Sequence, residues 1–403
     1  MSLRRFSLGF IVMFAVMMFT AAAPAAEKKP VINECVTCHE KVTPQIVKDW
    51  KAGKMSYLFA CDKCHGNAHM KGAEDAKLAV MPTAKTCQPC HGKQVEQFSN
   101  GKHALAWIAL NAMPETANQP KVIMEGMKGC GGCHRIALEG GKCDSCHTRH
   151  KFSKAEAKTP GACATCHMGF DHPQWEMYNT SKHGVIYNTE GDTGRAPTCQ
   201  TCHMQEGNHG VITSWGFLAL RLPEEDKEWM ADRVSILQAL GVLDNDGKPT
   251  GRLDVIKAGK VARLSREEWQ QHRDKMINTC KQCHSEDYAK KNLENADQVI
   301  KEADKLTAQA IREVQGLYKD GILKKPENVP FSVDTLRFYD APTPIEQKLY
   351  VMMLEHRMRT FQGAFHMNPD YMHWYGWAEL KRDLVEIKQE AAELRKKHEA
   401  EKK

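Results

Sequence analysis

"CGGCHRIALEGGKCDSCH", residues 130–147, contains the pattern Cys-x-x-Cys-His twice. The same pattern occurs eight times in the chain and accounts for all 16 cysteines. The cysteine pairs are Cys35–Cys38, Cys61–Cys64, Cys87–Cys90, Cys130–Cys133, Cys143–Cys146, Cys163–Cys166, Cys199–Cys202 and Cys280–Cys283. The histidines that directly follow these pairs are His39, His65, His91, His134, His147, His167, His203 and His284.

This repetition decides what the cysteines do. Zinc sites also use paired cysteines, but zinc gives no reason for a histidine in the same place eight times. Cys-x-x-Cys-His is the attachment signature of c-type haem, in which both thiols form thioethers and the histidine is the proximal iron ligand. The sequence therefore predicts eight covalently attached haem c groups.

The first 26 residues predict a signal peptide. Arg4 and Arg5 precede an apolar run from Leu8 to Phe19, and the small residues of "TAAAPAA" follow at 20–26. The alternative is an uncleaved membrane anchor, but the run is shorter than the roughly 20 apolar residues that a spanning helix needs. We therefore expect a soluble protein that is periplasmic or otherwise exported. Disulfides are the usual expectation after export, and the spacing of the cysteines argues against them.

Chain length limits how the haems are arranged. Of the 403 residues, roughly 47 per haem remain after the signal peptide, too few for separate haem domains. We expect stacked haems wrapped by protein, with porphyrin forming much of the apolar interior. The formal net charge of +6 omits two propionates per haem, which titrate near pH 4 to 5. The haem-loaded protein is therefore expected to be acidic, and no nucleic-acid partner is predicted.

The pattern along the chain predicts a mainly α protein in two parts. Residues 27–215 hold seven motifs joined by short linkers, which indicates loops and short helices on a haem stack. Residues 216–403 hold the eighth motif and helical patterns: a capping box at Ser265 and Glu268, a helix start at Pro344, and a last helix from Trp377.

A long helix is expected from Asp287 to Tyr318. Its apolar positions recur at intervals of three and four residues, which is typical of a helix with one buried face. This face either packs on the body of the protein or pairs with a helix of another subunit. The positions are Ala296, Val299, Ala303, Leu306, Ala310, Val314 and Leu317.

Eleven histidines remain after the eight proximal ones. A haem that only transfers electrons uses a second protein ligand, whereas a haem that binds substrate keeps one face open. Seven histidines are predicted to be distal ligands, which fits one open haem. They are His69, His103, His150, His183, His209, His272 and His356. His398 lies in a charged tail, and His172, His366 and His373 stay unassigned.

The chain resembles the octahaem hydroxylamine oxidoreductase family over essentially the whole mature sequence. The resemblance rests on the eight motifs, the 13-residue spacing of the fourth and fifth, "GFDHPQWEMY" at 169–178 and "EHRMRTFQGAFHMNPDYMHWYGW" at 355–377. It implies that the haem on Cys130, Cys133 and His134 is catalytic and lacks a distal protein ligand. It also implies that Asp171 and His172 project over the open face of this haem as a proton relay.

The same resemblance places a tyrosine in the catalytic pocket, and Tyr288 is the candidate. Oxidative members of the family bond their catalytic haem to a tyrosine of a neighbouring subunit in a trimer, whereas reductive members lack this bond. The candidates for the bonded residue are Tyr371 and Tyr375. The compact chain leans toward a reductive enzyme.

The predicted function is therefore an oxidoreductase acting on hydroxylamine or nitrite at one open haem, with seven electron-transfer haems. A homotrimer is expected, with a redox partner protein or a quinol-linked donor or acceptor. The alternative is a non-catalytic electron-transfer cytochrome in which all eight haems have two protein ligands. Other octahaem reductases use a lysine as a ligand of the active haem, and no motif here has lysine in place of histidine.

Overall fold

The computed structural model describes residues 29–110, 113, 119–215, 221–252, 265–325, 333–337 and 340–403. Throughout this part of the chain the fold is mainly α, and it contains no β-strand, only an isolated bridge between Leu243 and Pro249. None of the described helices is long and apolar enough to cross a membrane. The predicted signal peptide at 1–26 lies outside the described residues.

The described part of the chain contains α-helices, short 3₁₀-helices and two π-helical segments. The α-helices are α1 Glu34–Val42, α2 Pro44–Ala52, α3 Asp62–His65, α4 Ala84–Ser99, α5 Ala106–Ala109, α6 Lys121–Met124, α7 Cys130–His134, α8 Lys154–Ala157, α9 Gly161–Ala164, α10 Gln174–Asn179, α11 Lys182–Glu190, α12 Cys199–His203, α13 Lys227–Ala239, α15 Arg266–Cys280, α16 Glu286–Lys319, α17 Pro344–Val351, α18 Arg357–Phe365 and α19 Ala378–Glu401. Single turns and π-helical segments join them: η1 Lys54–Tyr57, η2 Ala73–Leu78, η3 Lys102–Leu105, η6 Arg135–Gly140, η7 Cys143–Ser145, η8 Gln205–Gly207, η10 Met352–His356 and η11 Tyr371–Trp377.

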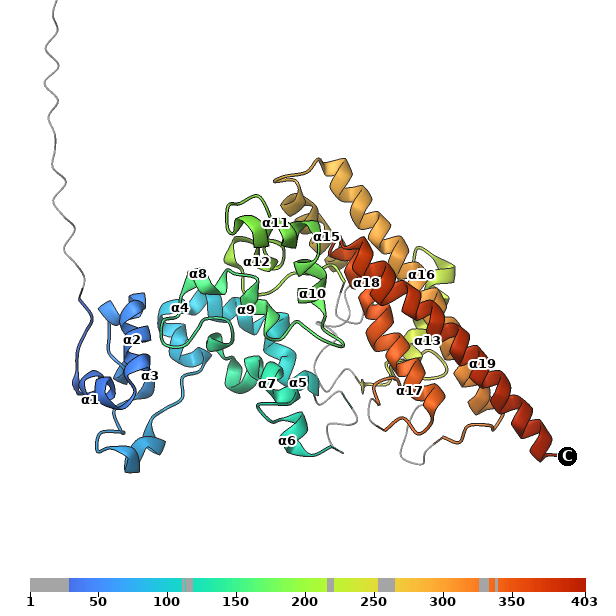
Figure 1. Ribbon diagram of the computed structural model, residues 1–403, viewed down its shortest axis with the longest axis horizontal. Helices are drawn as coiled ribbons and strands as arrows, with labels where there is room; N and C mark the ends of the chain where they lie inside the picture. The colour runs from blue at the N-terminus through green and yellow to red at the C-terminus, as the bar shows by residue number, and fades with distance from the viewer. Residues whose placement is uncertain are drawn as a thin grey trace, which may run out of the picture.

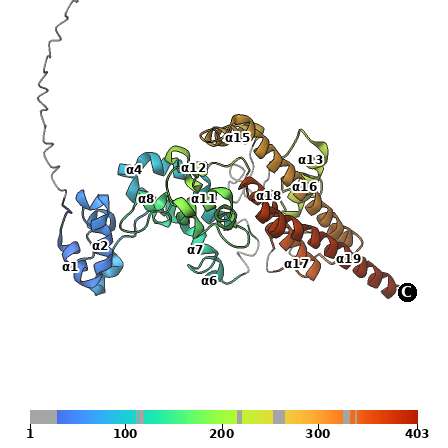
Figure 2. The same cartoon turned by 45° about the horizontal axis from the view of Figure 1, so that its top comes forward.

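The chain runs along the long axis of the molecule from one end to the other (Figures 1 and 2). Short helices α1 to α12 occupy residues 29–215, which we call the motif half. Long helices dominate residues 221–403, which we call the helical half. The predicted boundary between 215 and 216 adjoins residues that the structure does not describe, so the exact domain limits stay a prediction.

Helical turns in the motif half carry the attachment residues. Helices α7 and α12 begin at the first cysteine of a motif and end at its histidine. Because residues i, i+3 and i+4 share one face of a helix, such a turn presents both thiols and the imidazole on the same side. Thr198 caps α12 by accepting a hydrogen bond from the N–H of Thr201. Local sequence thus suffices to shape each attachment turn.

Helix α16 confirms the long helix expected from the apolar repeat. Six of the seven repeat positions are buried, and Val299 is half-buried. The buried face packs on α13, α18 and α19 of the same chain, as both views show (Figures 1 and 2). These side chains are therefore used within the chain, and the interpretation of this face as a pairing surface between subunits is wrong.

The expected helix starts are also confirmed. Ser265 accepts from the N–H of Glu268 while the Glu268 carboxylate accepts from the N–H of Ser265, which completes the capping box of α15. Helix α17 begins at Pro344, as expected. The last helix begins at Ala378, one residue later than predicted, because the preceding segment 371–377 is π-helical.

A buried charge network joins three helices of the helical half. Asp304 lies in the middle of α16 and is fully buried. Its carboxylate accepts hydrogen bonds from Trp229 Nε1 at 2.6 Å, Arg233 Nη2 at 2.5 Å and Arg357 Nε at 2.8 Å. Arg233 also lies over the ring of Trp215, the last described residue of the motif half. The network therefore ties α13, α16 and α18 together beside the junction.

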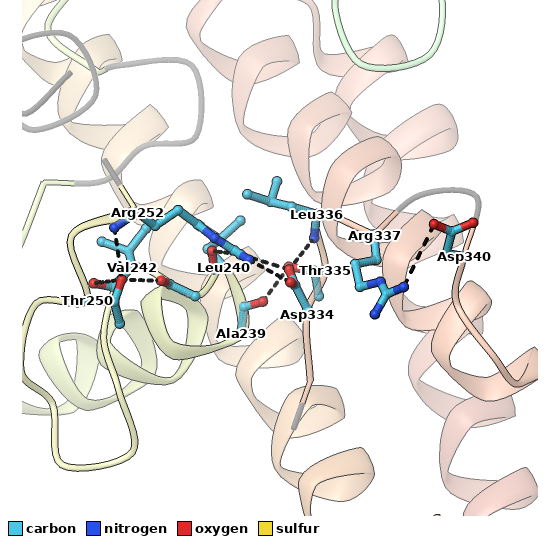
Figure 3. A network of polar contacts seen from close by, with 11 residues as sticks. Ala239, Leu240, Val242, Thr250, Arg252, Asp334, Thr335, Leu336, Arg337 and Asp340 are labelled. Carbon is cyan, nitrogen blue, oxygen red and sulfur yellow. Dashed lines mark hydrogen bonds and ion pairs between the residues drawn. The ribbon is translucent and has the colours of Figure 1, made fainter. Parts of the chain in front are cut away.

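A second network anchors residues 333–337 to the end of α13 (Figure 3). Arg252 forms two hydrogen bonds with the Asp334 carboxylate, at 2.9 and 2.7 Å, and a third with the carbonyl oxygen of Leu240. Thr335 donates from both its N–H and its hydroxyl to the Ala239 carbonyl oxygen. These bonds cap the C-terminal carbonyls of α13 and fix the segment that leads toward α17.

Candidate functional site

Six of the eight CxxCH histidines face a second histidine ring. An iron bound on both sides, with metal–nitrogen bonds of about 2 Å, holds the two ring centres roughly 6 Å apart. The observed separations are 6.1 Å for His39–His69, 6.2 Å for His65–His150, 6.4 Å for His147–His209, 6.1 Å for His167–His103, 6.3 Å for His203–His366 and 6.2 Å for His284–His183. Each gap fits one haem iron between two imidazoles.

The outer nitrogens of the proximal rings are held by acceptors. Nδ1 of His65 donates to the Val80 carbonyl oxygen at 2.8 Å, and Nδ1 of His134 donates to that of Ala106 at 2.6 Å. A carbonyl oxygen can only accept, so Nδ1 carries the proton and Nε2 keeps a lone pair. This tautomer is the one that a haem ligand requires.

Five of the seven predicted distal histidines lie opposite a CxxCH histidine: His69, His103, His150, His183 and His209. Their role as ligands stays a prediction that this spacing supports. The structure does not bring the other two to such a position.

His356 is the first of these exceptions. It is 7% exposed in the helical core, and its Nδ1 is bonded to the Asp383 carboxylate at 2.5 Å. A ring so enclosed leaves no face for a porphyrin, which does not fit the predicted role of a ligand. His272 donates from Nδ1 to the Thr213 carbonyl oxygen at 2.7 Å, and no CxxCH ring of the described chain stacks against it.

His366 is the candidate ligand that sequence reasoning missed. It lies directly after α18, far along the chain from every motif, and its ring faces His203. Its Nδ1 donates to the Gln362 carbonyl oxygen, which leaves Nε2 toward the gap. Most of the other distal candidates follow a motif closely or share a local pattern, whereas nothing in the sequence around His366 marks it.

Contacts between the cysteines order the motifs in space. The sulfurs of different motifs interact directly or through their charges, and in the haem-loaded protein they would be thioethers, so these contacts report position only. The sulfurs are hydrogen-bonded in the pairs Cys87–Cys143, Cys163–Cys199 and Cys133–Cys166. They are near enough to influence each other's pKa, without a direct contact, in the pairs Cys35–Cys61, Cys64–Cys87, Cys146–Cys163 and Cys202–Cys280. The spatial order is therefore first, second, third, fifth, sixth, seventh and eighth, with the fourth motif branching from the sixth.

Asp171 and His172 lie beside this fourth motif. Asp171 Oδ1 is 2.9 Å from His172 Nδ1, and both side chains are about one-third exposed. Asp171 acts electrostatically on Cys130 and Cys133, and both members of the pair act on His134. The structure thus brings the pair to the motif that the sequence resemblance named.

The fourth motif differs from the six paired motifs in what lies opposite its histidine. In the described chain no histidine ring stacks opposite His134. The same holds for His91 of the third motif, so a missing partner ring is not special to the fourth. What distinguishes the fourth motif is the acid–histidine pair next to it.

The electrostatics of the pair favour a charged carboxylate. Burial alone would raise the pKa of Asp171, but the hydrogen bond and charge of His172, together with His134, outweigh it and lower the pKa. An ionised Asp171 accepts a hydrogen bond from His172 Nδ1 and so orients the His172 ring. The His172 ring also lies 6.0 Å from His167, so it stands between the fourth and sixth motifs.

The candidate tyrosines lie in two other places. Tyr288 stacks on His284 with ring centres 4.9 Å apart, which places it at the eighth motif rather than against His134. Tyr371 and Tyr375 stack on each other at 5.1 Å in η11. Tyr371 is 8% exposed and Tyr375 is 54% exposed, so Tyr375 is the one that a neighbouring subunit can reach.

Comparisons with known proteins identify the family of the chain. The chain matches the family model described as "Seven times multi-haem cytochrome CxxCH" over residues 33–233 and 252–329. It is 28% identical over 330 residues to a probable nitrite reductase–hydroxylamine oxidoreductase fusion protein of Kuenenia stuttgartiensis. That match covers 67% of this chain and 37% of the relative, so the chain spans little more than a third of the relative's length.

Two solved structures resemble the fold. A reducing HAO-like protein complex of Kuenenia stuttgartiensis matches with a TM-score of 0.73 at 26% identity, covering 93% of this chain and 90% of that one. A hypothetical multihaem protein matches with a TM-score of 0.63 at 21% identity, covering 92% and 96%. The second likeness concerns the fold alone.

Proposed function

The chain belongs to the multi-haem cytochrome family with repeated CxxCH motifs, and from this premise we propose that it is an octahaem oxidoreductase of the hydroxylamine oxidoreductase type. Its proposed substrates are hydroxylamine or nitrite, converted at the haem of Cys130, Cys133 and His134. The observation that carries the proposal is the position of Asp171 and His172 beside this motif, where no histidine ring of the described chain stacks on His134.

The bound haem would supply an iron that holds the substrate nitrogen and exchanges electrons with it. The chain supplies the protons. Nδ1 of His172 lies 2.9 Å from Asp171 Oδ1, and the proposed role of the imidazole is to give a proton to the substrate or take one from it. A histidine exchanges protons near neutral pH, and the ionised carboxylate keeps the ring in one orientation.

The spatial order of the motifs supports the electron-transfer part of the proposal. The nearness of their cysteines orders seven motifs in one row, and the fourth joins it through the hydrogen-bonded pair of Cys133 and Cys166, the latter from the sixth motif. Electrons delivered at any motif of the row would reach the sixth and pass to the fourth. Seven haems would thus serve one site, so that no partly converted substrate needs to leave it.

We propose the reductive direction. One structural relative is described as a reducing complex, and one sequence relative carries a nitrite reductase name. In the oxidative case a tyrosine would join two chains covalently, and Tyr375 is the accessible candidate. We expect denaturing electrophoresis to show monomers. A heat-resistant trimer that Tyr375→Phe or Tyr371→Phe abolishes would instead make this a hydroxylamine-oxidising enzyme.

The deciding experiment is a pair of assays on the purified haem-loaded protein. Nitrite reduction with a reduced dye and hydroxylamine oxidation with an oxidised dye are measured beside the ferric absorption spectrum. We expect turnover, and a high-spin signal that changes when nitrite binds. If neither assay shows turnover and nitrite leaves the spectrum unchanged, the protein is an electron-transfer cytochrome.

Export, assembly and partners complete the proposal. Residues 1–26 would direct export to the periplasm or an equivalent compartment, where haem is attached. We propose a homotrimer that exchanges electrons with a redox partner protein or a quinol-linked donor. Mass spectrometry should find the mature chain plus eight haems, and a lower number after full maturation contradicts the haem count.

A further inference from the structure

The hydrogen bond between His69 and Asp75 sets this histidine apart. Nδ1 of His69 donates to Asp75 Oδ1 at 2.6 Å. In the other pairs for which the structure gives an Nδ1 partner, His65, His203 and His366 donate to backbone carbonyl oxygens, and His167 Nδ1 lies 3.2 Å from the neutral amide oxygen Oε1 of Gln174. Among the six pairs given above as fitting one haem iron each, His69 is the histidine whose Nδ1 is bonded to a carboxylate.

The backbone around Asp75 holds that carboxylate in place. Oδ2 accepts from the N–H groups of Met70 at 3.0 Å and Lys71 at 2.9 Å, and Oδ1 also accepts from Gly72 at 3.2 Å. Gly72 has φ +135°, a conformation that residues with a side chain rarely adopt, and this turns its N–H toward the acid. With 12% of its side chain exposed, Asp75 is a rigid acceptor that fixes the His69 ring.

The His69 ring faces the first motif. Its centre lies 6.1 Å from that of His39, with an angle of 72° between the rings. Nδ1 of His39 lies 2.8 Å from the hydroxyl oxygen of Thr43. One ring of this pair is therefore bonded to a neutral hydroxyl and the other to a carboxylate.

We propose that Asp75 is a positioning residue that lowers the reduction potential of the haem held between His39 and His69. A carboxylate that accepts from Nδ1–H gives the imidazole more anionic character, and such a ligand stabilises ferric iron over ferrous iron. The inference rests on the proposed haem ligands, and it adds to them a direction of electron transfer. The first haem gives up electrons more readily than the second, whose His65 is bonded to a carbonyl, so electrons are driven inward along the row.

The test is a potentiometric titration of the haem-loaded Asp75→Asn protein followed by visible absorption. One haem of the eight should be reduced more easily, with the ratio of reduced to oxidised haem at a fixed potential rising by about tenfold. Glu74→Gln is the matched control, because Glu74 is exposed, loses the same charge and makes no hydrogen bond to His69 in the described structure. An unchanged titration of Asp75→Asn, or an equal change in Glu74→Gln, overturns the proposal.

A second variant tests the ligand itself. His69→Ala should convert one ferric haem from low-spin to high-spin, because the opposite face of the iron on His39 loses its imidazole. A haem that stays low-spin means that His69 is not its ligand, which also overturns the proposal. Turnover of nitrite or hydroxylamine by the wild-type protein is measured separately. If the wild-type protein shows no turnover, the proposed function is wrong. The titration still measures the potential of the first haem and so still tests the role of Asp75.

Discussion

The motif half and the helical half stabilise themselves by different means. Of the 43 buried apolar residues in the described chain, 11 lie in the motif half and 32 in the helical half. The helical half therefore has a core of its own, built by α13, α16, α17 and α19. The motif half has seven of the eight attachment motifs and too few buried side chains for a comparable core. From this difference we infer that covalently bound porphyrin would fill the interior of the motif half, where the helical half has leucine and isoleucine.

Polar chemistry follows the same division. In the motif half most histidines are partly exposed and border gaps that are wide enough for a haem. In the helical half His356 is paired with Asp383 inside the core, and Asp304 is enclosed by two arginines. The buried carboxylates of Asp383 and Asp304 are thus paired with side chains of the same chain. The same kind of substitution should therefore have a different effect in the motif half and in the helical half.

Withholding haem should produce the largest effect. A chain made without haem attachment is expected to lose its structure across residues 29–215, because the porphyrin surface that replaces a core is missing, while the long helices of the helical half persist. Limited proteolysis followed by mass spectrometry would find the first cuts in the motif half. Equal protection of both halves would contradict the comparison.

Two of the histidine–aspartate pairs, one from each half, offer the next test. His172→Ala should lower turnover by about a hundred- to ten-thousand-fold with haem content unchanged, since His172 is the proposed proton relay. His356→Ala should leave turnover per folded molecule intact and lower the free energy of unfolding by about 1 to 3 kcal/mol, because Asp383 loses its buried partner. The measurements are steady-state kinetics, a haem assay and denaturant unfolding.

One result would reverse the assignment of His172. If His172→Ala gains a further high-spin haem and keeps its turnover, then His172 is a distal ligand. The haem concerned would be that of His167, whose ring lies 6.0 Å from His172.

A charge removed from the helical core should affect stability and leave the chemistry of the site unchanged. Asp304→Asn leaves Arg233 and Arg357 buried without their counter-charge, and we expect a loss of about 3 to 5 kcal/mol in the free energy of unfolding. Glu401→Gln is the control, because its ion pair with Lys397 is exposed and contributes little. Haem content should be unchanged in both variants. Loss of haem from Asp304→Asn would show that the two halves fold as one unit.

The smallest expected effect is the change in local stability with pH and with salt. Hydrogen bonds from the N–H groups of Met70 and Lys71 help lower the pKa of Asp75 to about 2, and bonds from Lys281 and Lys290 lower that of Glu286 to about 2. Both values lie below those of the free side chains. The stability from each carboxylate is therefore fully present above about pH 4 and is lost as the pH falls toward 2.

Salt should reduce the stability contributed by one of these carboxylates more than that contributed by the other. Glu286 is exposed and its partners are mobile lysines, so about 1 M salt weakens its contribution, whereas the backbone donors of Asp75 are insensitive to screening. Hydrogen exchange at residues 70–78 and 281–290, followed against pH at low and high salt, measures both. Equal salt sensitivity at the two sites would contradict this.

Much of the architecture follows from local sequence. Attachment needs only five adjacent residues, so every motif could be identified without a structure. The α16 face and the Ser265 capping box are also local patterns, because helix periodicity and caps act within a few residues. The pairing of Asp171 with His172 was visible for the same reason, since the two are adjacent in the chain.

Only the tertiary structure decided which histidines meet. His356 and His366 stand ten residues apart in one helical segment, and nothing local distinguishes them. Packing encloses His356 against Asp383 and leaves His366 facing His203. The branch of the fourth motif from the sixth likewise depends on contacts between segments far apart in the sequence. The physical reason is that attachment is covalent chemistry within one helical turn, whereas pairing across an iron depends on where the whole chain places two distant side chains.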